Sequence, residues 1–138
     1  MSEMFGNFFR VMGEVIERFE GHEANRLGDG SLIYFGYPRA QEDAAVRAVL
    51  AATALVNEIR ERVVDPEGNA VGVRVGIASG MVVVDHANER SVFGDTPNIA
   101  ARLQGLAGVG EIVIAESTKA LIRDVVEIEP LGPHALKG

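Results

Sequence analysis

The stretch covering residues 25–38, NRLGDGSLIYFGYP, places a Gly-Asp-Gly sequence between two short apolar segments. The flanking segments, His22–Leu27 and Ser31–Phe35, are typical of β-strands, and an aspartate between glycines is typical of a tight turn. The stretch therefore predicts a β-hairpin with Asp29 at its tip. This carboxylate could be an ordinary turn residue, or it could bind a hard divalent cation through its oxygens.

Two helices are expected on either side of this hairpin. Between Met4 and Phe19 the apolar residues recur at spacings of three and four, which indicates an amphipathic helix. After the hairpin, the acidic residues within 41–43 suit a helix N-terminus, and the alanine-rich sequence that follows predicts a helix to about Val63.

The second half of the chain alternates between short strands and short helices. Two strands, or one bent strand, are expected over Val71–Ala78 and Met81–Val84, where β-branched residues dominate. A polar loop and a short strand over residues 91–93 follow. Thr96 is placed to cap a helix that begins at Pro97. The remaining predicted elements are a strand over residues 111–115, a helix over residues 117–123 and a strand over residues 125–131.

This order of elements predicts an α+β fold with a mostly antiparallel sheet flanked by helices. A length of 138 residues suits one domain, so we expect residues 1–138 to form a single unit. A ferredoxin-like domain would start with a strand before its first helix, whereas this sequence starts with the helix.

The composition excludes several classes of function. The formal net charge is −7 and the 13 Lys and Arg residues are scattered, which argues against binding nucleic acid through its phosphates. The chain has no cysteine, and no apolar run is long enough for a membrane span. We therefore expect a soluble protein of the cytoplasm, which would need a cation or a few well-placed basic groups to bind an anionic nucleotide.

Asn98 and Arg102 are the second set of candidate functional residues. They are four residues apart, so they share one face of the helix expected from Thr96. Asn98 lies in the first turn, where free N–H groups favour anions, and an arginine can bind a phosphate through two parallel hydrogen bonds. Both residues could equally be ordinary polar groups on a solvated helix face.

Five sequence blocks follow one another along the chain: Leu27–Gly30, Tyr34–Pro38 with Gln41–Asp43, Val73–Ile77 with Gly80, Phe93–Leu103, and Leu131–Gly138. Taken in this order, they closely resemble the catalytic domain of class III adenylyl and guanylyl cyclases. The resemblance extends over nearly the whole chain, and bacterial cyclase domains are the most similar in detail.

This resemblance implies a ferredoxin-like cyclase fold and a role for each candidate residue. Asp29 matches the second of two aspartates that bind two divalent ions, Mg²⁺ or Mn²⁺. Asn98 and Arg102 match the residues that orient the ribose and stabilise the transferring phosphate, and Lys137 matches a lysine that contacts the triphosphate. The family's active sites form between the two subunits of a head-to-tail dimer, so a homodimer that binds ATP or GTP is implied.

The sequence departs from the family pattern in one missing element, at two candidate base-recognition positions, and in the loop over residues 85–90, which is short for the bacterial subgroup. The family's first strand, with the first metal-binding aspartate, is not found before the opening helix, so the expected domain is truncated at its N-terminus. Asn25 stands where adenylyl cyclases usually have a purine-binding lysine. Ser91 stands at its partner position, which is often Asp or Thr.

Two functions therefore remain open at the level of sequence. The first is a nucleotide cyclase, most simply one that converts ATP to cyclic AMP and pyrophosphate. The second is a catalytically degenerate cyclase-like module that binds nucleotide or dimerises without turnover. A ferredoxin-like RNA-binding domain is a weaker third reading, since the sequence shows neither an aromatic platform nor a basic sheet face.

Overall fold

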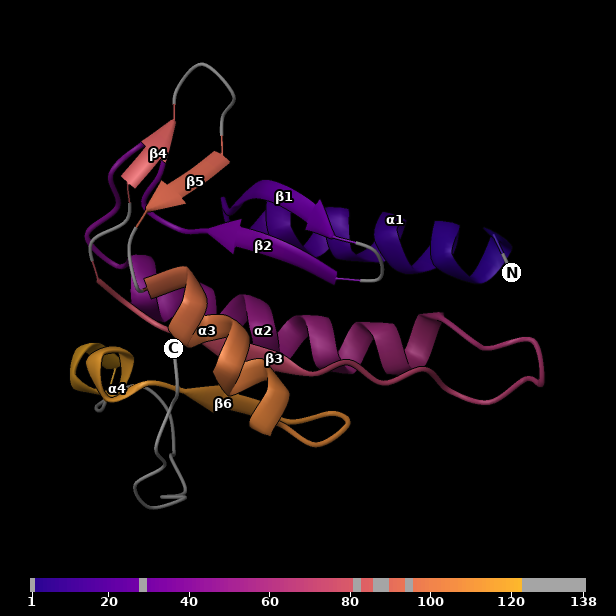
Figure 1. Cartoon of the computed structure of the whole chain (residues 1–138). Helices are drawn as coiled ribbons and strands as arrows, with labels where there is room; N and C mark the ends of the chain where they lie inside the picture. The colour runs from indigo at the N-terminus through magenta and orange to yellow at the C-terminus, as the bar shows by residue number, and fades with distance from the viewer. Residues whose placement is uncertain (1, 28–29, 81–82, 86–89, 94–95, 123–138) are drawn as a thin grey trace.

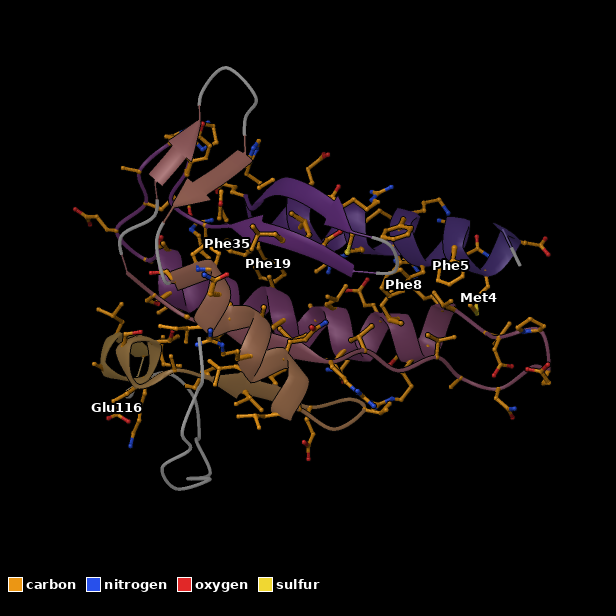
Figure 2. The ribbon with its side chains drawn as sticks, viewed as in Figure 1. Met4, Phe5, Phe8, Phe19, Phe35 and Glu116 are labelled. Carbon is orange, nitrogen blue, oxygen red and sulfur yellow. The ribbon has the colours of Figure 1, made fainter. Side chains whose placement is uncertain are left out.

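The structure, a computed structural model, describes residues 2–27, 30–80, 83–85, 90–93 and 96–122. It contains four helices and six strands within these ranges (Figure 1). In chain order the elements are α1 (Ser2–Arg18), β1 (His22–Leu27), β2 (Gly30–Tyr34), α2 (Ala44–Arg62), β3 (Val75–Ile77), β4 (Val83–Asp85), β5 (Arg90–Phe93), α3 (Thr96–Leu106), β6 (Ile112–Ile114) and α4 (Glu116–Ile122).

The hairpin predicted from the Gly-Asp-Gly sequence is confirmed. Strands β1 and β2 pair in antiparallel fashion, from His22 opposite Tyr34 to Leu27 opposite Gly30. The register shifts between Glu23 and Asn25, as at a β-bulge. Asp29 itself lies outside the described residues, so its proposed role stays a prediction.

The described strands form three separate pairs. Besides β1–β2, the pair β4–β5 is antiparallel and the pair β3–β6 is parallel. The α+β class is therefore confirmed, and α3, which connects β5 to β6, packs against both strands of the parallel pair. The predicted strand over residues 71–78 is shorter than expected, since only Val75–Ile77 pair, and the predicted strand over residues 125–131 lies outside the described residues.

The largest core lies between α1 and α2. Val11, Val15 and Ile59 are completely buried, and Val63, directly after α2, is almost so. The apolar side of α1 therefore faces α2, as the spacing of its apolar residues predicts. A smaller apolar cluster of Leu103, Ala107 and Val113 joins α3 to β6. Within the described residues, no helix is long and apolar enough to cross a membrane.

Charged side chains connect α1 and α2 at the edge of this core. Glu58 on α2 accepts hydrogen bonds from Arg18 on α1 and from Arg62, and Arg62 also forms an ion pair of 2.8 Å with Glu14 on α1. The hydrogen bond from Arg18, supported by Arg62, holds the pKa of the Glu58 carboxyl below its usual value of 4.5. These groups are accessible to solvent, so each pair contributes little by itself.

This network predicts a small dependence of stability on acid. Because the pKa of Glu58 is lower in the folded chain than in the unfolded chain, its contribution is complete above about pH 4.5 and is lost as the pH falls through the folded value. Thermal unfolding measured between about pH 6 and pH 3 should show a shallower decrease for Glu58→Gln than for the parent. The control Glu61→Gln, on the same helix, should keep the parent's slope, and equal slopes for all three proteins would contradict the prediction.

Candidate functional site

A large groove runs between the β1–β2 hairpin and the layer formed by β3 and α3. Its volume is about 1100 Å³, and residues of β2, of α1 and α2, and of β3 and α3 line it. Figure 1 shows the hairpin on one side of this region and α3 on the other, with α2 behind them. The groove could not be predicted from the sequence, because its walls come from distant segments of the chain.

Helix α3 is held close to β3 by a glycine. A side chain at Gly76 would collide with the carbonyl oxygen of Ala100 and the amide nitrogen of Gln104, both of which belong to the backbone of α3. Only a residue without a Cβ atom permits this approach. The beginning of α3 is equally close to the chain after β3, since a Cβ atom at Gly80 would lie 2.8 Å from the hydroxyl of Thr96.

Asn98 and Arg102 lie on α3, one turn apart, as predicted. The helix starts at Thr96, one residue earlier than the predicted start at Pro97. Asn98 is exposed and lines the groove, whereas Arg102 is half-buried and does not line it. Neither side chain forms a hydrogen bond or ion pair with another residue in the described part of the chain.

Asn25 and Ser91 are carried by strands that contact each other. Asn25 is on β1, opposite Leu32, and Ser91 is on β5, opposite Val84. Strands β1 and β5 lie side by side although more than sixty residues separate them (Figure 1). The backbone therefore brings the two candidate base-recognition positions into one region.

The remaining candidates are not brought to this region by the described chain. In Figure 1 the ends of β1 and β2 that flank Asp29 lie at the opposite end of the hairpin from the start of α3. Asp29 and Lys137 both lie outside the described residues. Among the residues that the structure describes, no three His, Asp or Glu side chains gather closely enough to hold a metal ion.

Ser79, which lines the groove, makes polar contacts with α4 that the sequence did not reveal. The hydroxyl of Ser79, which follows β3, lies 2.8 Å from the hydroxyl of Thr118, and Thr118 is completely buried. The hydroxyl of Ser117 accepts a hydrogen bond of 3.2 Å from the Ser79 amide. These contacts join α4 to the end of β3. They could not be predicted because 38 and 39 residues separate the partners.

The family model described as the adenylate and guanylate cyclase catalytic domain matches residues 1–138. The chain therefore belongs to this family of nucleotide cyclase catalytic domains. An adenylate cyclase of Mycobacterium tuberculosis is 26% identical over 134 residues, which are 94% of this chain. The chain spans 30% of the length of that relative.

Solved cyclase structures share the fold. The guanylyl cyclase Cya2 superimposes with a TM-score of 0.83 at 26% identity, over 99% of this chain and 75% of its own. The adenylyl cyclase CyaB from P. aeruginosa gives the same TM-score at 24% identity, over 99% of this chain and 76% of its own. The predicted cyclase fold is thus confirmed. Similar folds occur in cyclases named for both nucleotides, so the fold does not select between ATP and GTP.

The glycine contact beneath α3 leads to a prediction about the position of the candidate site. In Gly76→Ala the added methyl group meets helix backbone, which cannot rotate away as a side chain can, so α3 must move outward. We expect a loss of stability of about 1–3 kcal/mol in chemical denaturation. Gly105→Ala on α3, where an added Cβ atom meets nothing within 4 Å, is the matched control and should not be destabilised. Equal stability of the two variants would contradict this account.

Proposed function

We propose that this chain is the catalytic domain of a nucleotide cyclase that converts ATP to cyclic AMP and pyrophosphate. The observation that carries the proposal is the position of Asn98 and Arg102 on α3. Asn98 lines the groove. Arg102 lies one turn further along the helix, and its guanidinium has no ion partner among the described residues. Membership of the cyclase family gives this pair a chemical context.

To catalyse this reaction the protein must mainly position the reacting groups of the nucleotide and neutralise the negative charge of its phosphates. The 3′-hydroxyl of the nucleotide attacks its own α-phosphorus, a new P–O bond forms, and the bond to the pyrophosphate oxygen breaks. The hydroxyl proton is released, and the leaving pyrophosphate takes the electron pair. In this proposal Asn98 orients the ribose, Arg102 meets the charge that grows on the α-phosphate, and Lys137 contacts the triphosphate.

We further propose that the active sites are shared between two copies of the chain. In Figure 1 the described ends of β1 and β2 next to Asp29 lie at the opposite end of the hairpin from the start of α3. One copy therefore cannot present both sets of residues to one nucleotide, whereas a two-fold dimer can place the hairpin of one copy beside α3 of the other.

A divalent ion, Mg²⁺ or Mn²⁺, would supply positive charge at the phosphates. The described residues do not by themselves form a metal site, so Asp29 is proposed as a ligand and the other ligands are not assigned. ATP is proposed as the substrate because the mycobacterial relative is named an adenylate cyclase. Asn25 and Ser91 are proposed to contact the base, since their strands meet.

The second candidate is a cyclase-like module that binds nucleotide or dimerises without turnover. The observation that favours it is the lack of a three-ligand metal cluster among the described residues. Incubation of the chain with Mn²⁺ and either ATP or GTP separates the two candidates, because only a cyclase releases cyclic nucleotide and pyrophosphate in equal amounts.

The role of Arg102 can be tested by substitution. Arg102→Ala should reduce cyclic nucleotide production at least about 100-fold, since it removes a charge that acts on the transition state. The matched control is Arg60→Ala, which removes an exposed arginine of α2 that only bonds to Asn57. The control should retain the parent's rate. Equal turnover by Arg102→Ala and the parent would refute the proposed site.

The shared site can be tested by mixing two inactive proteins. In a homodimer of Asp29→Ala, or of Arg102→Ala, both active sites lack an essential residue. A mixed dimer, however, has one site in which both residues are intact. An equal mixture that exchanges subunits should therefore recover about a quarter of the parent's activity. Absence of recovery, with mixed dimers demonstrated by mass spectrometry of the native complex, would contradict a site shared in this way.

A further inference from the structure

Two charged residues of β1 contact each other although a regular strand would hold them on opposite faces. Glu23 accepts two hydrogen bonds from the guanidinium of Arg26, one of 3.2 Å from Nε and one of 3.1 Å from Nη2. Residues three positions apart in a regular strand point to opposite sides, because side chains alternate with a period of two. The contact therefore requires an irregularity in β1 between these two residues.

The strand register identifies this irregularity as one extra residue in β1. Glu23 pairs with Ile33, and Asn25 pairs with the next residue of β2. Ala24 consequently has no partner of its own on β2. An extra residue of this kind is a β-bulge, and it exchanges the two faces of the strand for the residues that follow it. The two charged residues, on either side of the bulge, thus share one face of the hairpin.

The face that carries this contact is the one that packs against α1. The hydroxyl of Ser31 donates a hydrogen bond of 2.6 Å to the Glu23 carboxylate. The guanidinium carbon of Arg26 lies 4.0 Å from the centre of the Phe9 ring of α1, in a cation–π contact. Ile33 of β2 packs against the core between α1 and α2. We call Glu23, Arg26 and Ser31 the β1 clamp.

The bulge also decides on which face of the hairpin Asn25 lies. In the bulged register Asn25 is opposite Leu32. If the pairing at the start of β1 continued without a bulge, Asn25 would be opposite Ser31, on the face that packs against α1. A position against α1 is unsuitable for contact with a base. The bulged register is therefore the one that permits the proposed role of Asn25.

The β1 clamp favours the bulged register over the regular one. Both contacts of Arg26, with Glu23 and with Phe9, need Arg26 on the α1 face, so they are lost if the bulge is lost. An exposed ion pair contributes little by itself. A carboxylate that accepts from a forked guanidinium and from a hydroxyl is held more firmly, and the stacked ring fixes the guanidinium in turn.

We propose that Glu23 is a positioning residue for recognition of the purine base. The β1 clamp holds the bulge, and the bulge holds Asn25 on the face of the hairpin where the base binds. This inference rests on the proposed function, in which Asn25 contacts the base. Glu23 itself touches no part of the nucleotide and acts only through Asn25.

The proposal can be tested by steady-state kinetics of the full chain with ATP and Mn²⁺. Glu23→Ala should raise KM for ATP about fivefold to tenfold, as expected for loss of one hydrogen bond to the base, and should change kcat less than about twofold. Asn25→Ala should raise KM to the same extent. Glu23→Gln retains a carbonyl oxygen that accepts from Arg26 and Ser31, so its KM should stay within about twofold of the parent's.

A combined variant separates positioning from a general weakening of the hairpin. If Glu23 acts only through Asn25, Glu23→Ala together with Asn25→Ala should have the KM of Asn25→Ala alone. Independent effects would multiply. The matched control is Glu14→Ala, which removes ion pairs of α1 with Arg10 and Arg62 and should keep the parent's KM.

Hydrogen exchange followed by mass spectrometry reports on the bulge without any reference to activity. Peptides covering residues 22–27 should exchange at least about fivefold faster in Glu23→Ala than in the parent. Peptides covering α3 should exchange at the parent's rate, since the β1 clamp does not touch that helix.

Several results would overturn this inference and leave the proposed function intact. They are an unchanged KM in Glu23→Ala or in Asn25→Ala, multiplied effects in the combined variant, and unchanged exchange over residues 22–27. If the parent binds ATP without turnover, the dissociation constant replaces KM in each comparison. A parent that neither binds nor converts ATP would overturn the proposed function itself, and this inference with it.

Discussion

The packing of α1 against α2 is the contact on which the rest of this fold depends. Val11 and Val15 from one helix meet Ile59 from the other with no exposed surface. Complete burial of branched aliphatic side chains is the largest stabilising contribution that a domain of this size can make. The β1–β2 hairpin, which connects these helices, and β3, which follows α2, are both positioned by that core. The orientation of the groove walls follows from it.

The functional residues depend on a second and more local constraint. Gly76 lets the backbone of α3 approach β3, and this approach directs Asn98 into the groove. The groove itself exists because the described strands form separate pairs instead of one continuous sheet. In our interpretation the start of α3, where Asn98 lines the groove, belongs to the proposed nucleotide site.

Much of the fold and some of the site could be predicted from local sequence patterns. The hairpin, the two long helices and the helix with Asn98 and Arg102 follow from turn residues and apolar spacing, which act over a few positions. The short extent of β3 could not be predicted, because Val71 and Val73 alternate as strand residues do, yet among the described residues the pairing with β6 begins only at Val75. The contact between Ser79 and Thr118 could not be predicted either, since it joins segments that are far apart in the sequence.

The sequence by itself determined the order of the elements, the membership of the cyclase family and the residues that match its motifs. These properties depend on residue type and spacing, and both can be read directly from the sequence. Only the tertiary structure decided that β1 and β5 meet, that Asn98 lines a groove and that residues of β2 and β3 line the same groove. The physical reason is that the hydrophobic effect depends on how much apolar surface is buried and not on which segments bury it. It therefore brings together segments that are far apart in the sequence, and the local pattern of one segment does not indicate its partner.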